Sequence, residues 1–310
     1  MNLKKAIVVS AAVSGGIVTA LGASLKIFTS LAFDREPIVK LMQTGGYELK
    51  GDAKAGQEWL HENDRDIRVM TNPEGLKLYG HYIPCENAKR TVIAFHGWHG
   101  AWDVDFAACA PYLHEMDCNL LLIEERAQGR SDGEIMTFGI MERKDVLPWV
   151  TWYQENIDAS IPIYLYGVSM GATTVLMASA DAFPAEVKGI IADCGFTSPY
   201  AIIKTVGEEK FHNPEHPCMD MMNFYCKWRK GFSLDDCSSL DALKKTTLPI
   251  LFVHGADDKF VPCEMTKEAY EHCNSEKDLL LVEGAGHAMS FVKGKEAYME
   301  KLHTLFAAND

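Results

Sequence analysis

Short apolar runs alternate with longer amphipathic stretches along this 310-residue chain, and this alternation constrains the fold more than any other feature. Apolar runs of about four to eight residues, bounded by Gly or polar residues, are typical of buried strands. Strands that alternate with helices predict a mostly parallel central sheet with helices on both faces, which is an α/β fold. The predicted strands are 67–71, 76–83, 91–95, 119–123, 161–166, 187–192, 248–254 and 279–282.

The residues that directly follow each strand carry the functional information, because ligands on such sheets bind beyond the carboxyl ends of the strands. The segment 167–171 reads GVSMG and joins the strand 161–166 to a predicted helix. This order predicts a nucleophile elbow, a sharp turn that glycines permit and that leaves a serine hydroxyl exposed at its tip. Ser169 is therefore the candidate nucleophile.

A serine hydroxyl is a poor nucleophile until a base takes its proton. Of the eleven histidines, only His96, His254 and His287 directly follow an apolar strand. His96 and His254 are each followed by glycine and open a loop, whereas His287 comes just after the last predicted strand. We therefore predict His287 as the base.

The base needs a buried carboxylate that holds its tautomer. Asp257 and Asp258 both follow the strand 248–254, and adjacency does not choose between them. Asp193, after the strand 187–192, is a rival acid. The residues alone leave these alternatives open.

Two backbone amides are needed to stabilise an oxyanion. The first is predicted to be the amide of Met170, directly after the candidate nucleophile. The second is expected in the loop after the strand 91–95, with Trp98 as the predicted donor. His96 and His99 in this loop have the i, i+3 spacing of a metal pair, but no carboxylate or cysteine directly beside them completes a ligand set, so no metal is predicted.

The alternation of strands and helices breaks between Thr197 and Thr247, where methionines and aromatic residues are interspersed with polar ones. This pattern predicts a helical cap insertion at about 197–247, within a domain that spans residues 34–310. Its apolar residues indicate an acyl group as ligand, because Met adapts to irregular apolar partners. The alternative is that they only pack the cap onto the sheet.

An uncharged stretch covers residues 6–25, and residues 27–33 are apolar again after a single lysine. Twenty uncharged residues in a helix would just cross the hydrocarbon core of a bilayer. We expect residues 1–33 to form a retained, transmembrane N-terminal anchor, and the flanking lysines do not decide its orientation. A signal peptide that is cleaved before secretion, and a buried or peripheral helix, are the alternatives.

Composition excludes some classes of function. The formal net charge is −13 and no long basic run is present. Nucleic acid is therefore not an expected partner, because phosphate binding needs clustered Lys and Arg. The nine cysteines include no C-x-x-C pair, which leaves a zinc ribbon or a thioredoxin-like site unsupported. Scattered cysteines in a long chain are typical of reduced thiols.

Four segments of the chain resemble the α/β-hydrolase superfamily, and the likeness extends from about residue 66 to the C-terminus. Within the superfamily, the chain resembles a branch of bacterial, often membrane-anchored, esterase-like hydrolases that are frequently described as serine-aminopeptidase-like. The segments that carry the resemblance are 95–97, 165–172, 253–262 and 286–287.

The resemblance implies a choice of acid. In the family pattern, the acid is the fifth residue counted from the His of the His-Gly pair, here His254, and this position is Asp258 rather than Asp257. The chain order Ser, Asp, His is also that of the fold. One departure is visible, because Glu124 stands where the family usually has Asp. That position is structural in the family.

The resemblance implies a serine hydrolase that cleaves carboxylic esters through an acyl-enzyme. Ser169 would be the nucleophile, His287 the base and Asp258 the acid that orients the base, and no cofactor is implied. A small ester or acyl molecule is the expected substrate. A peptidase or thioesterase on the same triad is one alternative, and a binding protein of this fold without turnover is another.

Overall fold

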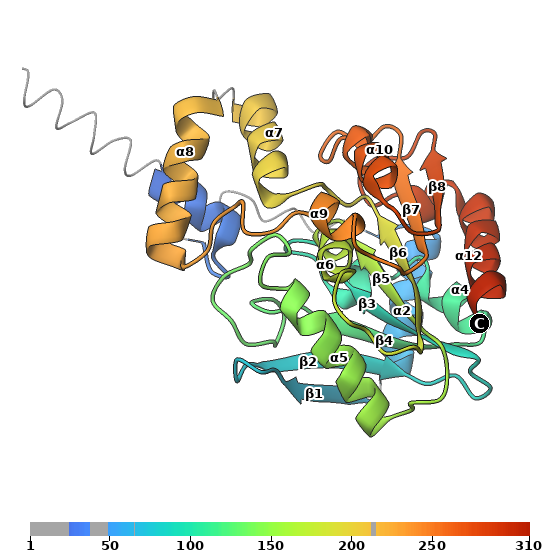
Figure 1. The fold of residues 1–310 in the computed structure, drawn as a ribbon. Helices are drawn as coiled ribbons and strands as arrows, with labels where there is room; N and C mark the ends of the chain where they lie inside the picture. Colours follow the sequence, from blue (N-terminus) through green and yellow to red (C-terminus); the bar gives the residue numbers. More distant parts are fainter. Residues whose placement is uncertain (1–24, 38–48, 65, 212–214) are drawn as a thin grey trace, which may run out of the picture.

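The computed structural model describes residues 25–37, 49–64, 66–211 and 215–310. An eight-stranded sheet with the strand order β1-β2-β4-β3-β5-β6-β7-β8 forms the centre of the molecule (Figure 1). The strands are β1 (Ile67–Thr71), β2 (Lys77–Ile83), β3 (Arg90–Phe95), β4 (Cys118–Glu124), β5 (Ile163–Val168), β6 (Val187–Asp193), β7 (Ile250–Gly255) and β8 (Lys277–Val282). Only β2 pairs antiparallel, with β1 and with β4, among these described strands. The predicted α/β fold with a mostly parallel sheet is confirmed.

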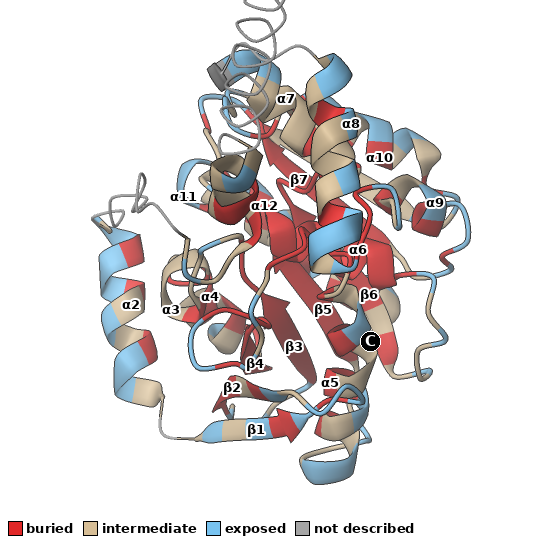
Figure 2. Ribbon diagram, turned by 90° about the vertical axis from the view of Figure 1, so that its left-hand side faces the viewer, coloured by how far each residue is buried: buried red, intermediate tan, exposed pale blue. Residues whose placement is uncertain are grey.

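Helices cover both faces of the sheet. They are α2 (Asp52–Asn63), α3 (Trp102–Asp105), α4 (Ala110–Glu115), α5 (Arg143–Asn156), α6 (Met170–Ala178), α9 (Ser239–Leu243), α10 (Cys263–His272), α11 (Ser290–Lys293) and α12 (Lys295–Asn309). Side chains alternate along a strand, so Val92 and Ala94 of β3 pack with α3, α4 and α12, while Ile93 and Phe95 pack with α5, α6 and α9. Figure 2 shows the central strands buried between these two layers.

The segment between β3 and β4 is not one continuous helix. It contains two short helices, α3 and α4, and the second of them begins at Ala110 with a proline in its first turn. Proline has no N–H and fits the first turn of a helix, whereas in a helix interior it breaks the hydrogen-bond ladder. Pro111 therefore begins a new helix instead of continuing the old one.

The predicted insertion contains helices between β6 and β7. They are α7 (Pro199–Phe211), α8 (Glu215–Tyr225), the π-helix η1 (Cys226–Lys230) and α9. An apolar cluster joins this segment to the carboxyl ends of the strands, because Met219 and Phe232 pack in one cluster with Met170 and Val261. Met170 follows β5 and Val261 follows β7, so the segment lies over the edge of the sheet where the candidate site residues are expected.

The predicted transmembrane anchor requires a correction. No helix within the described ranges is long and apolar enough to cross a membrane, so the prediction of a membrane-anchored protein is wrong for that part of the chain. Residues 25–33 are helical, and the apolar Phe33 is fully buried against the rings of Phe138 and Phe232 instead of facing lipid. Residues 1–24, which include the rest of the predicted anchor and the alternative signal peptide, lie outside the described residues.

Candidate active site

Ser169 lies in the turn between β5 and α6, with φ of 55° and ψ of −114°. A positive φ is unfavourable for a residue that has a Cβ, so the surrounding structure has to hold it. A Cβ added to Gly171 would lie 1.9 Å from the carbonyl oxygen of Phe95, and one added to Gly167 would lie 2.2 Å from the carbonyl oxygen of Gly171. The two glycines therefore permit the sharp turn that the sequence predicts.

The close approach at Gly171 gives a prediction for stability. We expect Gly171→Ala to lower the free energy of unfolding by about 1–3 kcal/mol or more, because backbone atoms of β3 occupy the space that the methyl group needs. Urea denaturation measures this change. Gly207→Ala on α7 is the matched control, because a Cβ there meets nothing within 4 Å. The control should raise stability by about 0.5–1 kcal/mol, and equal losses in both variants would contradict the argument.

His287 lies in the loop after β8 and contacts both other candidate residues. Its Nε2 is 2.9 Å from Ser169 Oγ, and its Nδ1 is 2.7 Å from Asp258 Oδ2. These residues follow three different strands of the same sheet. The structure thus brings together the candidate nucleophile, base and acid, which are 118 and 29 residues apart along the chain.

The carboxylate of Asp258 is fully buried and hydrogen-bonded. Its Oδ1 accepts hydrogen bonds from the amides of Phe260 (2.8 Å) and Val261 (2.9 Å). Burial alone would raise the pKa of Asp258, but hydrogen bonds from His254 and His287 outweigh it and hold this pKa well below its ordinary value. Asp258 is therefore an anion at neutral pH and can only accept a hydrogen bond from His287.

The rival acids have other surroundings. Asp257 is exposed, and its amide donates to the carbonyl oxygen of Ala285. The buried carboxyl of Asp193 accepts a 2.8 Å hydrogen bond from Ser290 Oγ, and burial raises its pKa. The backbone carbonyl of Asp193 also accepts the amide of Ser169 at 2.8 Å. Asp193 thus supports the turn at Ser169 while Asp258 contacts the imidazole.

The loop after β3 passes directly beside the candidate nucleophile. A Cβ added to Gly97 would lie 3.3 Å from Ser169 Cβ. The amide of Gly97 donates to Asp105 Oδ2 at 2.6 Å, which ties the loop to α3. His96 is engaged on both sides of its ring, since Nδ1 is 2.9 Å from the carbonyl oxygen of Gly97 and Nε2 accepts the amide of Glu125 at 3.3 Å. This histidine supports the loop.

Trp98 is held by the N-terminal part of the described chain. Its indole N–H donates to the carbonyl oxygen of Ala32 at 2.9 Å, and its ring stacks on Phe138 with centroids 5.8 Å apart. Arg35, three residues after Ala32, donates in turn to the carbonyl oxygens of Ser131 and Gly129, both at 2.6 Å. The N-terminal segment is therefore part of the wall around the loop that carries the predicted oxyanion donor.

Glu124, which stands where the family usually has Asp, makes structural contacts. Its Oε1 accepts hydrogen bonds from His81 (2.9 Å) and from Nε of Arg130 (2.9 Å). Burial opposes ionisation, but these bonds lower the pKa of Glu124 to about 2. Glu124 therefore ties the loop after β4 to β2, and these two partners lie outside the chain of contacts from Ser169 to Asp258.

Two other features of the described residues have the composition or shape of a ligand site. Ligand atoms of Cys194, Asp258 and His287 lie within 4.8 Å of one another. A cation at this point would have to break the hydrogen bond between Asp258 and His287.

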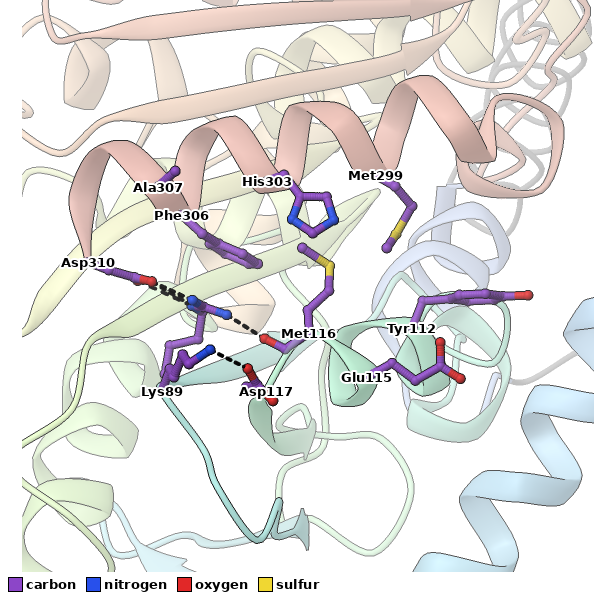
Figure 3. A pocket seen from close by; sticks show the side chains of 11 residues that line it. Lys89, Tyr112, Glu115, Met116, Asp117, Met299, His303, Phe306, Ala307 and Asp310 are labelled. Carbon is purple, nitrogen blue, oxygen red and sulfur yellow. Dashed lines mark hydrogen bonds and ion pairs between the residues drawn. The ribbon is translucent and has the colours of Figure 1, made fainter.

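An open hollow of about 450 Å³ lies between α4 and α12 (Figure 3). Arg90, the first residue of β3, lines this hollow and pairs with Asp310. The hollow therefore lies at the amino end of β3, whereas Ser169 lies at the carboxyl ends of the strands.

The structure contains three supporting contacts that the sequence pattern did not predict. Asp105 holds Gly97, Ala32 holds Trp98, and His254 reaches Asp258. The first two contacts involve backbone atoms, the amide of Gly97 and the carbonyl oxygen of Ala32. The residue type at these positions does not predict such a contact. The third spans only four residues, so the i, i+4 spacing across the end of β7 was the one available clue.

Comparison with known proteins supports a hydrolase. Residues 165–289 match the family model of serine hydrolase (FSH1). The uncharacterized protein YqkD of Bacillus subtilis is 24% identical over 292 residues, which cover 92% of each chain. Alpha/beta hydrolase domain-containing protein 17C of Homo sapiens is 34% identical over 74 residues, which are 24% of this chain and 22% of that protein.

A solved structure agrees with the topology described above. The esterase Pf2001 of Pyrococcus furiosus superposes with a TM-score of 0.64 at 21% identity, covering 81% of this chain and 95% of the esterase. At this identity the likeness bears on the fold alone. The chain therefore has the α/β-hydrolase fold, and its segment from 165 to 289 is similar to a family of serine hydrolases.

Proposed function

We propose that this protein is a serine hydrolase that cleaves carboxylic esters of small molecules through an acyl-enzyme intermediate. The observation that carries the proposal is the pair of hydrogen bonds from Ser169 Oγ to His287 Nε2 (2.9 Å) and from His287 Nδ1 to Asp258 Oδ2 (2.7 Å). Distances of this size allow a proton to pass from the hydroxyl to the imidazole. The match to a serine hydrolase family over residues 165–289 supports the same chemistry.

In the proposed mechanism, Ser169 Oγ attacks the ester carbonyl while His287 Nε2 takes its proton. The amides of Met170 and Trp98 stabilise the oxyanion. The C–O bond to the alcohol then breaks as His287 returns the proton to the leaving oxygen, which leaves an acyl group on Ser169. Water repeats the sequence, with His287 again as the base, and releases the carboxylic acid. Asp258 holds the imidazole in the tautomer that accepts a proton at Nε2.

We further propose a domain layout for this activity. Residues 34–310 form the hydrolase domain, and the segment at about 197–247 is a cap inserted after β6. The packing of Met219 and Phe232 with Met170 supports a cap that lies over the site. A relation to the esterase-like branch often described as serine-aminopeptidase-like is part of this proposal.

Covalent labelling tests the proposal. A fluorophosphonate probe should modify the protein, and mass spectrometry should locate the phosphonyl group on the peptide that contains Ser169. Acyl esters, thioesters and aminoacyl amides at equal concentration then rank the substrate classes, and esters should be cleaved fastest. Equal labelling of the wild type and Ser169→Ala would refute the assignment. Labelling without turnover of any substrate in the panel would instead indicate a binding protein.

The contact of Trp98 with Ala32 gives a separate prediction. Trp98→Phe removes the indole N–H but keeps an aromatic ring that stacks on Phe138. We expect kcat for ester hydrolysis to fall by roughly two- to tenfold, the value of one neutral hydrogen bond, with a smaller change in KM. The reason is that the loop of the oxyanion donor is less firmly held. An unchanged kcat would show that the indole contact does not position this loop.

A further inference from the structure

A second imidazole contacts the carboxylate of Asp258. His254 lies near the end of β7 and is fully buried. Its Nε2 is 3.2 Å from Asp258 Oδ2 and 3.0 Å from the carbonyl oxygen of Val261. The same Oδ2 is 2.7 Å from His287 Nδ1. The carboxylate of Asp258 thus lies between two histidines, of which only His287 also contacts Ser169.

The partners of His254 determine where its proton is. A carboxylate and a backbone carbonyl are acceptors only, so Nε2 of His254 has to carry a hydrogen in order to bond to them. On the other side of the ring, Nδ1 is 2.6 Å from Thr266 Oγ1, and this hydroxyl lies 3.3 Å from the carbonyl oxygen of Gly195. Thr266 belongs to α10 and is itself buried. The ring is therefore held at both nitrogens, with an N–H directed at the candidate acid.

With this second imidazole, every acceptor position of Asp258 is used. The amides of Phe260 and Val261 bond to Oδ1, and His254 and His287 bond to Oδ2. A carboxylate offers about four acceptor positions. Rotation of this side chain would break at least one of these bonds in a buried environment, so His254 restrains the orientation in which Asp258 meets His287.

We propose, on the basis of the proposed function, that His254 is a positioning residue of the triad. Its Nε2–H fixes the carboxylate of Asp258 and takes up part of its negative charge. The negative charge that remains on Asp258 stabilises the imidazolium that forms when His287 takes the proton of Ser169. The hydrogen bond from His254 therefore determines how strong this stabilisation is. His254 therefore adjusts the pH range in which the base is active, without touching the substrate.

Other ionisable groups surround this pair of histidines. The thiol of Cys194 comes from the end of β6 and lies within 4.8 Å of the ligand atoms of Asp258 and His287. Asp193 acts electrostatically on both histidines, and Asp105 acts on His287 from α3. A substitution at His254 leaves all three in place. A change in pH dependence on such a substitution therefore reports on the hydrogen bond that His254 makes.

The wild-type protein allows a first test that does not depend on activity. ¹⁵N nuclear magnetic resonance of labelled histidines assigns the protonated nitrogens of each ring. We expect His254 to carry a hydrogen on Nε2 that exchanges slowly with water, because the residue is fully buried. A spectrum in which Nε2 of His254 has no hydrogen at neutral pH would overturn the proposal, whatever substrate the protein is found to cleave.

Kinetics of two variants give the second test. His254→Leu removes the donor, and His254→Gln places an amide N–H near the position of Nε2. For His254→Leu we expect kcat to fall about tenfold or more at an unchanged KM, as for the loss of a hydrogen bond to a charged group. Without the hydrogen bond from His254, the full negative charge of Asp258 stabilises the protonated form of His287. The acid limb of the pH–rate profile should therefore move to higher pH. In His254→Gln, both kcat and the position of the acid limb should be closer to those of the wild type than in His254→Leu.

A control separates positioning from general loss of stability. Tyr153→Phe removes a buried 2.6 Å hydrogen bond with Thr91, which lies at the amino end of β3, away from the candidate site. It should lower the melting temperature but leave the acid limb in place. If His254→Leu does not fold, Thr266→Val keeps the imidazole and should move the limb in the same direction by less. Folded His254→Leu with a wild-type profile would overturn the proposal. Absence of esterase activity in the wild type would count against the proposed function, while the resonance test would still decide the role of His254.

Discussion

Ser169→Ala and His287→Ala are each expected to lower kcat for ester hydrolysis by a factor on the order of 10⁶, and the double variant by no more than either single one. The reason is that the hydroxyl and the imidazole act as one unit, joined by the 2.9 Å contact between Oγ and Nε2. Without His287 the hydroxyl has no base, and without Ser169 the base has nothing to activate. Steady-state kinetics of the two single variants and the double variant measure this non-additivity.

The size of the residual activity carries further information. A rate above that of water should persist in all three variants, because the predicted oxyanion donors are backbone amides that these substitutions leave in place. Stability should fall by no more than about 0.5–1.5 kcal/mol for Ser169→Ala, since the variant loses one hydroxyl and its hydrogen bond with His287. Losses that add in the double variant would show that the two side chains act independently, which contradicts the proposed mechanism.

The strand ends explain why the sequence could predict that the candidate site residues lie close together. Ser169, Asp258 and His287 each follow an apolar run, and parallel strands bring their carboxyl ends to one edge of a sheet. Glycines mark the turn at Ser169 because backbone atoms come within about 2 Å of where a Cβ would be. The pattern therefore encodes the position of these side chains along the chain, and the fold brings them together.

The sequence did not predict how the N-terminal segment contacts the rest of the fold. Trp98 and Ala32 are 66 residues apart, and the acceptor is a backbone carbonyl that any residue would supply. The apolar residues at 27–33 were interpreted as part of a membrane anchor, although Phe33 packs on Phe138 and Phe232. Hydropathy measures how apolar a segment is but does not identify the surface that it contacts. For this reason lipid and a protein interior give the same signal in a short segment.

Asp258→Asn is expected to lower kcat about 10⁴-fold while the structure of the site is retained. An asparagine amide at this position can donate a hydrogen bond to His287 Nδ1, 2.7 Å away, which selects the tautomer with its hydrogen on Nε2. That tautomer cannot accept the proton of Ser169. KM should change little, because the side chain of Asp258 is fully buried and a bound substrate would not reach it. Asp257→Asn is the matched control, since it removes the same charge from an exposed neighbour and should leave kcat nearly unchanged.

The same variant tests the electrostatic environment of the acid. The pKa of Asp258 in the folded protein lies well below that of an unfolded aspartate, which is about 3.9. A carboxyl with a lowered pKa adds stability above the unfolded pKa, and this contribution is lost as the pH falls towards the folded pKa. The difference in unfolding free energy between wild type and Asp258→Asn should therefore be constant near neutral pH and decrease below about pH 4. Hydrogen bonds from the two imidazoles cause this decrease. A difference that stays constant down to pH 2 would mean that these bonds do not lower the pKa of Asp258, and would contradict the contact between its carboxylate and His287 on which the proposed role depends.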